Sequence, residues 1–111
     1  MFEPIHVLTT TAQQHDAQRI AQTLLEKRLA ACVQVAGPIT STYRWQGQVE
    51  TSQEWLCIAK TDRAHYQAVE DEIRRMHPYE VPEIVATPIV AGSPGYLHWL
   101  QDALKHPGAD L

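Results

Sequence analysis

A histidine and a cysteine carry the side chains best suited to metal chemistry in this sequence. His77 is followed by Glu80 and Glu83, so a neutral imidazole there would lie near carboxylates. Such a set suits copper(II) or zinc, with copper the tighter by the Irving–Williams order. Cys32 offers a soft thiolate, which copper(I) prefers. His77 is therefore the first candidate metal ligand and Cys32 the second. A functional site would need two or three further ligands, and a neighbouring subunit is one source of them.

Both residues also have structural explanations. The helix dipole favours an imidazolium at the end of a helix, where we expect His77. A cysteine between Ala31 and Val33 is typically a small core residue, and Cys57 is explained in the same way. On the hairpin predicted below, the two cysteines lie roughly 13 Å apart, beyond disulfide reach. We therefore expect free thiols that share no metal within one chain.

A second group of residues indicates an anion or small-ligand site. Glu54 and Lys60 have the same parity on one predicted strand, so their side chains lie on the same face. Lys60 would supply the charge, and Trp45 and Trp99 would form the walls. The alternatives are a Glu54–Lys60 salt bridge between subunits and tryptophans that anchor an interface.

No catalytic motif accompanies these residues. Ser41, Ser52 and Ser93 lie in no G-x-S-x-G context, and the chain has no Gly-rich phosphate loop. We therefore predict a protein that is not an enzyme and requires no cofactor, with copper(II) or another divalent cation as a ligand.

The elements that would position these residues follow from hydrophobic periodicity and turn signals. A strand at 5–10 precedes a helix opened by a Thr11–Gln14 capping box. Long strands at 31–45 and 49–61 are joined by a turn at Gln46-Gly47. The remaining elements are a helix capped by Asp62 and ended by Pro78, a strand at 83–90, a helix at 96–104 and a frayed tail at 106–111.

This order is β-α-β-β-α-β with a short C-terminal helix. It predicts an α+β fold, a ferredoxin-like antiparallel sandwich with two helices on one face of the sheet, as a single domain over 1–111. The long hairpin should overhang so small a sheet and leave backbone groups that a partner subunit can cover. His6 alternates with Ile5 and Val7, so it faces the other side of the sheet, whereas His15, His65 and His106 are expected to be solvated.

Composition excludes several classes of function. The 111 residues include nine Lys and Arg against thirteen Asp and Glu, a net charge of -4, which argues against nucleic-acid binding. No apolar run reaches the roughly 20 residues of a membrane span. The first residues, 1–6, lack the basic start and apolar block of a signal peptide, so we expect a cytoplasmic protein.

Several segments together resemble the CutA family of divalent-cation tolerance proteins. They are Arg28-Leu-Ala-Ala-Cys-Val33, Ser41-Thr-Tyr-Arg-Trp-Gln-Gly47, His77-Pro-Tyr-Glu-Val-Pro-Glu83 and Tyr96-Leu-His-Trp99. The resemblance implies a ferredoxin-like fold assembled as a homotrimer through pairing of the long hairpins, with an architecture similar to the PII signalling proteins. It also implies a role in tolerance of divalent metals, copper above all, with no enzymatic reaction.

The resemblance also implies site residues. The cleft between subunits would use Trp45, Glu54, Lys60, His77, Tyr79 and Trp99, and Cys32 would be a copper ligand. This chain departs from the family pattern at Gln34, Gln48, Cys57 and His98, so neither Cys57 nor His98 is expected to be a shared ligand.

Two hypotheses follow. In the first, a trimeric divalent-cation tolerance protein binds copper(II) or a similar metal near the inter-subunit cleft. In the second, a PII-like trimeric sensor or scaffold binds a small molecule in the cleft, and metal binding is incidental.

Overall fold

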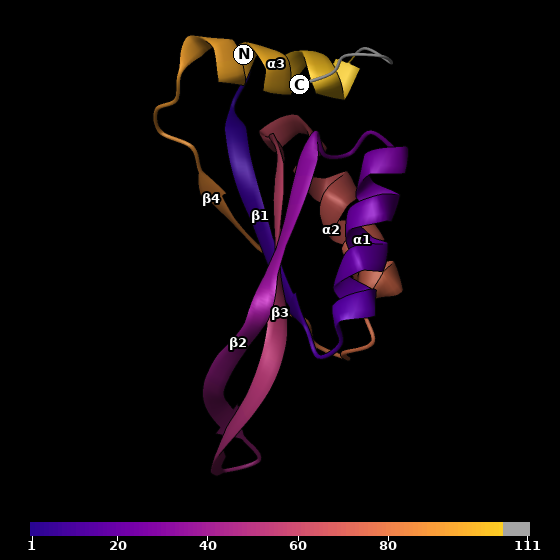
Figure 1. Ribbon diagram of the computed structural model, residues 1–111, viewed down its shortest axis with the longest axis vertical. Helices are drawn as coiled ribbons and strands as arrows, with labels where there is room; N and C mark the ends of the chain where they lie inside the picture. Colours follow the sequence, from indigo (N-terminus) through magenta and orange to yellow (C-terminus); the bar gives the residue numbers. More distant parts are fainter. Residues whose placement is uncertain (106–111) are drawn as a thin grey trace.

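Four antiparallel strands in the order β2-β3-β1-β4 form the sheet of the computed structural model, which describes residues 1–105. The strands are β1 (Pro4–Thr11), β2 (Cys32–Trp45), β3 (Gln48–Asp62) and β4 (Val85–Pro88). Helices α1 (Gln14–Glu26) and α2 (Tyr66–Met76) cover one face of the sheet, and a 3-10 turn, η1 (Arg63–His65), precedes α2 (Figure 1). Helix α3 (Pro94–Lys105) lies across one end of the sheet. The ferredoxin-like prediction with its C-terminal helix is confirmed.

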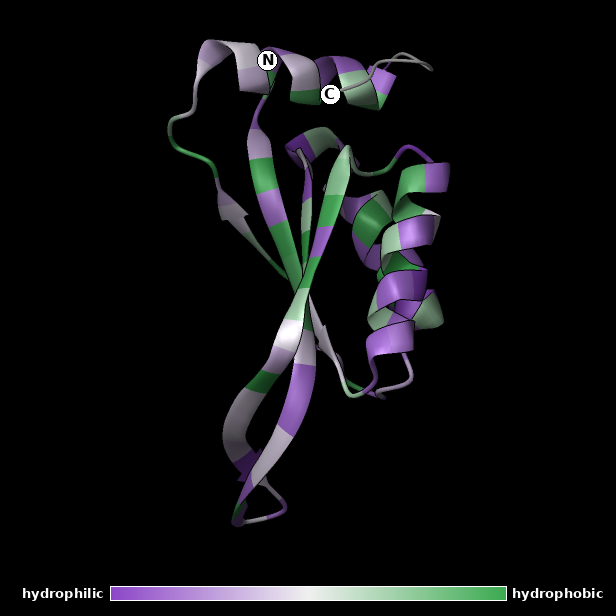
Figure 2. Cartoon of the chain, viewed as in Figure 1, coloured by the Kyte–Doolittle hydropathy of each residue, from purple (hydrophilic) through white to green (hydrophobic). Residues whose placement is uncertain are grey.

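The core lies between the sheet and the two helices. Alternate residues of β1 are buried toward the helices, as Ile5 and Val7 are. Ile20 of α1 and Ile73 of α2 meet them from the other side, as their helical spacing predicts. Figure 2 shows this alternation of hydrophobic and hydrophilic residues and the weaker hydrophobicity of the outer hairpin. The opposite face of the sheet carries no helix along most of its length (Figure 1).

The β2–β3 hairpin confirms the predicted turn. Gln46 and Gly47 both have positive φ, 49° and 77°, and Trp45 pairs with Gln48. This is the geometry of a tight two-residue hairpin turn, which accommodates glycine readily. β1 pairs with β3 only from Trp55 to Asp62, so residues 48–54 extend past the sheet with β2 as their one partner (Figure 1). The overhang is confirmed.

A bulge interrupts β2 at Gly37-Pro38. Ala36 pairs with Leu56 and Ile39 with Glu54, so two residues of β2 oppose Trp55 alone. On the other side of the bulge, Cys57 lies opposite Val35, three residues along β2 from Cys32.

Two boundaries differ from the sequence-based expectation. Thr11 does not cap α1, because it is buried at the end of β1 and its Oγ1 donates to Gln13 O at 2.8 Å. Strand β4 is shorter than predicted and pairs only with residues 5–8 of β1. Asp62 does cap the next element, accepting from the His65 amide at 3.0 Å. The predicted tail at 106–111 lies outside the described residues.

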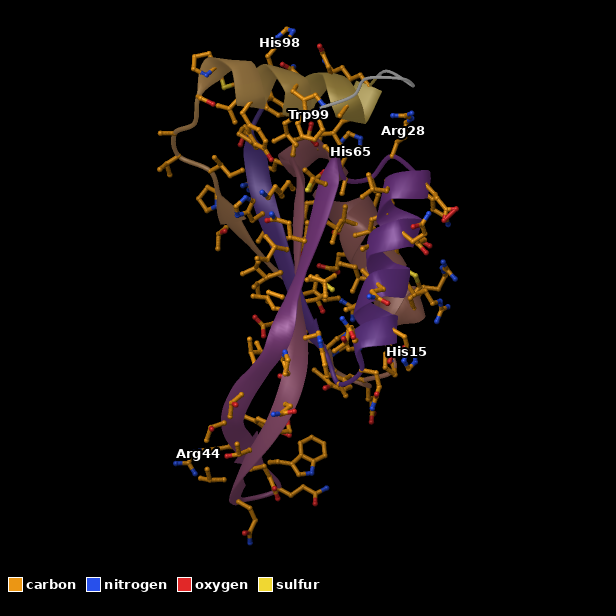
Figure 3. The ribbon with its side chains drawn as sticks, viewed as in Figure 1. His15, Arg28, Arg44, His65, His98 and Trp99 are labelled. Carbon is orange, nitrogen blue, oxygen red and sulfur yellow. The ribbon has the colours of Figure 1, made fainter. Side chains whose placement is uncertain are left out.

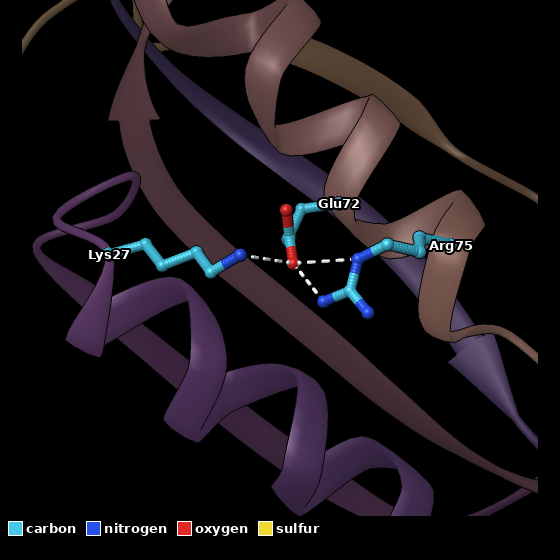
Figure 4. A network of polar contacts seen from close by, with 3 residues as sticks. All are labelled: Lys27, Glu72 and Arg75. Carbon is cyan, nitrogen blue, oxygen red and sulfur yellow. Dashed lines mark hydrogen bonds and ion pairs between the residues drawn. The ribbon is translucent and has the colours of Figure 1, made fainter.

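Helices α1 and α2 are tied together by one carboxylate. Glu72 Oε1 of α2 accepts from Lys27 Nζ at the end of α1 at 2.9 Å, and Arg75 donates to the same oxygen (Figure 4). A shared acceptor of this kind holds the two helices at a fixed separation over the sheet.

Candidate functional site

His77 links the end of α2 to the central strand. Its Nε2–H donates to the carbonyl oxygen of Thr10 at 2.7 Å, and its Nδ1 accepts from the Tyr79 amide at 3.1 Å. This pattern requires the neutral imidazole, because Nδ1 serves as an acceptor. The residue is only 8% exposed. A metal bound at either ring nitrogen would have to displace a backbone partner.

Tyr79 and Glu54 form a buried pair beside His77. The Tyr79 hydroxyl donates to Glu54 Oε2 at 2.8 Å, and the Tyr79 and His77 rings lie 4.7 Å apart. Burial, the hydrogen bond to Glu54 and the negative charge of that carboxylate raise the pKa of Tyr79 well above its ordinary value. The phenol therefore stays a hydrogen-bond donor, and the two residues hold the loop after α2 against β3.

Lys60 lies at the other end of β3 in a row of polar side chains. Cys32 of β2 and His6 of β1 are its register partners on either side. Partners across neighbouring strands point to the same face, which here is the face opposite α1 and α2. Lys60 Nζ lies over the ring of Tyr96 of α3, 5.7 Å from its centroid. Burial and the Lys60 charge lower the pKa of His6.

Trp99 packs beside Tyr96, with ring centroids 5.6 Å apart. Figure 3 shows Trp99 on the side of α3 that faces the sheet and His98 on the opposite side. Trp99 and Cys32 also border an open groove of about 560 Å³ between α1 and the free edge of β2. Cys32 is half-buried at this edge, so its thiol is more accessible than that of Cys57.

Trp45 lies apart from the other predicted cleft residues. It ends β2 at the tip of the hairpin, beside the labelled Arg44 in Figure 3, and is 59% exposed. Trp45 pairs with Gln48, and Lys60 lies twelve positions beyond Gln48 along β3. Trp45 and Lys60 are therefore roughly 40 Å apart along the hairpin. Glu54 lies about midway. One chain therefore brings together Glu54, Tyr79 and His77, but neither Trp45 nor Lys60 joins them.

The two candidate metal ligands are also separated. His77 contacts Thr10 of β1, whereas Cys32 lies in the same row as His6 of β1. Thr10 and His6 are about 13 Å apart along that strand. Within residues 1–105 no group of three or more His, Cys, Asp or Glu side chains could hold a metal ion. A metal site that used either residue would need ligands from outside residues 1–105.

Cys57 and His65 have structural roles. Cys57 is 1% exposed, and burial raises the pKa of its thiol to about 11, as expected of a core cysteine. Both cysteines are free, as predicted. His65 was expected to be solvated, but it is half-buried with Nδ1 2.5 Å from Asp62 Oδ1, whereas His15 is exposed.

Sequence reasoning missed the neighbourhood of Lys60. The alternation of β1 places His6 on the right face, but the partner of His6 depends on the β1–β3 register, which no local signal encodes. The contact with Tyr96 depends in turn on how α3 meets the end of the sheet.

A family model of the CutA1 divalent ion tolerance protein matches residues 5–103 of this chain. The chain belongs to the CutA family. The divalent-cation tolerance protein CutA of Thermus thermophilus is 45% identical over 96 residues, which cover 86% of this chain and 93% of that protein. CutA proteins form a non-enzymatic tolerance family, in agreement with the sequence-based prediction.

Solved CutA structures have the same fold. CutA1 from Ehrlichia chaffeensis matches with a TM-score of 0.90 at 30% identity, over 96% of this chain and 99% of that one. The structure described as the periplasmic CutA of Archaeoglobus fulgidus matches with a TM-score of 0.88 at 37% identity, over 92% and 99%. No helix in the described range 1–105 is long and apolar enough to cross a membrane.

Proposed function

We propose that this chain acts as a homotrimeric divalent-cation tolerance protein that binds copper(II) or a similar cation at a site completed by a neighbouring subunit. One observation carries the proposal: the candidate ligands His77 and Cys32 lie too far apart to share a metal in one chain. The family assignment supports the cation as ligand.

Exposed apolar surface supports the assembly. The hairpin tip presents Trp45 and Val49, which are 59% and 66% exposed. Side chains of Leu8, Leu56 and Ile58 lie on the sheet face that α1 and α2 leave uncovered. Exposed apolar side chains at the hairpin tip and partly exposed ones on the open sheet face are typical of surface that a protein partner covers.

The sheet edges support a cyclic arrangement. β2 and β4 are the two edge strands, so a contact between the β2 edge of one copy and the β4 edge of the next is head-to-tail. Head-to-tail contacts close into a ring when the rotation allows it. The overhanging hairpins would pair between copies, and Trp45 of one subunit would join Glu54, Lys60, Tyr79 or Trp99 of another in a shared cleft.

Titration of the thiol-reduced protein with copper(II) and zinc, with light scattering to measure the assembly, tests this function. We expect tight, stoichiometric copper binding to a trimer. His77→Gln should weaken it by at least about tenfold if the ring is a ligand, and Cys32→Ser should weaken copper(I) binding. His98→Gln is the matched control, because His98 is exposed and pairs only with Asp102 within residues 1–105. An equal loss of copper affinity in the His77 and His98 variants, or light scattering that shows a monomeric protein, would contradict the proposal.

A second candidate is a small-molecule sensor or scaffold that uses the same inter-subunit cleft. The engagement of both His77 nitrogens by backbone groups favours it, because the imidazole has no free lone pair for a metal. Retained copper binding in His77→Gln, together with a metabolite that raises the melting temperature of the trimer, would favour this candidate.

The cytoplasmic location is part of the same proposal. Two free cysteines are compatible with a reducing compartment. Fractionation of the native cells tests it, and recovery from an exported fraction would contradict it.

A further inference from the structure

Lys60 is a half-buried cation without a carboxylate partner among residues 1–105. By contrast, the cations Lys27, Arg63, Arg74 and Arg75 each have an acidic partner there. The Lys60 ammonium lies over the face of Tyr96, 5.7 Å from the ring centroid. Lysine is seldom buried without a counter-charge, because removing an ammonium from water is costly. A negative charge supplied from outside residues 1–105 would therefore pair favourably with this ammonium.

Glu54 is poorly placed to supply that charge. It lies six residues from Lys60 along β3, roughly 20 Å away within one chain. Its Oε2 already accepts the Tyr79 hydroxyl at 2.8 Å, and the side chain is 8% exposed. Moving Glu54 to a Lys60 of another copy would break this contact and leave Tyr79 without its acceptor.

The groups beside Lys60 are hydrogen-bond donors. His6 is its register partner on β1, and Thr87 of β4 is the next residue in the same row. Cys32 follows on the other side, on β2. The row contains an ammonium, an imidazole, a hydroxyl and a thiol, but no carboxylate. The ammonium, the imidazole and the hydroxyl can all donate hydrogen bonds, so they are complementary to a negatively charged oxygen ligand.

We propose that this row on the uncovered sheet face is a binding site for a small oxyanion, a carboxylate or phosphate group, with Lys60 as its charge and His6 and Thr87 as hydrogen-bond donors. Tyr96 holds the Lys60 ammonium in place from α3. Apart from Cys32 at the end of the row, the site uses neither of the proposed cation ligands, and it does not depend on cation binding.

Proton uptake should accompany anion binding. Lys60 of β3 and the neutral Thr87 of β4 are the register partners of His6. Beyond Lys60 lie Cys32 of β2, its other register partner, and Tyr96 of α3, whose ring contacts the Lys60 ammonium. Burial and the Lys60 charge lower the pKa of His6 and so favour the neutral imidazole in the free protein. An anion beside Lys60 offsets that charge and favours the imidazolium, so binding draws in a proton.

Isothermal titration of the full assembled chain with inorganic phosphate and, separately, with malonate tests the site. Each titration is run in two buffers of different ionisation enthalpy, which reports proton uptake. Lys60→Gln should weaken binding by at least about tenfold. His6→Gln keeps a donor and should retain most of the affinity while losing the proton uptake. Lys105→Gln removes an exposed lysine from the same helix as Tyr96 and should change neither.

Several results would overturn the proposal. One is an absence of binding by the unaltered protein, and another is an equal effect of Lys60→Gln and Lys105→Gln, which would mean general attraction to a charged surface. A crystal structure of the assembly in which a carboxylate of a neighbouring subunit pairs with Lys60 would also refute it. If Lys60→Gln fails to assemble, the His6 imidazole NMR signals of the unaltered protein must shift on phosphate addition for the site to stand. A failed copper titration would leave this result untouched.

Discussion

Tyr79 donates a 2.8 Å hydrogen bond to Glu54, and this contact attaches the loop after α2 to the overhanging hairpin, at the residue of β3 next to those that pair with β1. The acceptor is 8% exposed, so the loss of the donor leaves a carboxylate oxygen with little access to water.

Replacing this donor should destabilise the fold. Tyr79→Phe leaves Glu54 without its partner, at a cost of about 1–3 kcal/mol. Urea unfolding at a fixed protein concentration measures the effect, because assembly couples stability to concentration. Tyr66→Phe is the matched control, since its hydroxyl donates to Glu70 at the surface and should cost less. Equal shifts in the two midpoints would show that burial of Glu54 does not matter.

Cys57 should make stability depend on pH in alkali. Its thiol has a pKa raised from 9.0 to about 11 by burial, so the folded chain holds the proton more tightly than the unfolded one. The resulting stabilisation is complete below pH 9.0 and is lost as the pH rises toward about 11. Cys57→Ala should remove this component, which appears as a difference in the slope of unfolding free energy against pH. Identical slopes would contradict the assignment.

Gly37 should tolerate no side chain. A Cβ at this position would lie 2.7 Å from Trp55 Cδ1 and 3.1 Å from Glu54 O. We expect Gly37→Ala to cost about 1–3 kcal/mol through displacement of the indole and the bulged backbone. Gly95→Ala is the control, because a Cβ there meets nothing within 4 Å and α3 gains a better helix former. Thermal denaturation of both variants separates the two outcomes, and a stable Gly37→Ala protein would refute the packing argument.

Glu72 should contribute to stability only while it is ionised. Hydrogen bonds from Arg75 and then Lys27 lower its pKa below the ordinary 4.5. Its contribution is therefore present above pH 4.5 and lost as the pH falls through the lowered value. Glu72→Gln should lower the melting temperature near neutral pH, and less so in acid or at high salt. Glu26→Gln is the control, because the Glu26 carboxylate has no ion pair within residues 1–105, and this variant should change the melting temperature little. Equal decreases in the two variants would exclude a stabilising link between α1 and α2 through Glu72.

Local patterns were sufficient to predict most of the fold. The Gln46-Gly47 turn, the α2 stripe ending before Pro78 and the Asp62 cap all depend on neighbouring residues, and all are found. The Thr11 capping box failed because burial in the sheet outweighed a weak local signal. Strand β4 is short because its one partner, β1, is matched over residues 5–8 only.

The candidate sites were harder to predict because they depend on contacts between distant segments. The His77–Thr10 bond joins residues 67 positions apart, and it occupies the nitrogen that a metal would need. The family resemblance grouped Trp45 with Lys60, but their separation along one hairpin means that only an assembly can unite them. No pattern within a single sequence encodes that step.

The central position of β1 has a consequence for synthesis on the ribosome. This strand is made first, yet its two neighbours are β3 and β4, which begin at Gln48 and Val85. The β2–β3 hairpin closes through a two-residue turn, so it is free to form as soon as residue 62 emerges. By contrast, β1 can pair with β3 only by closing a loop of more than forty residues. The nascent chain therefore carries an apolar strand with both edges unpaired until more than half of the sequence has left the tunnel. During that interval, binding by a chaperone would protect residues 4–11 more than any other strand.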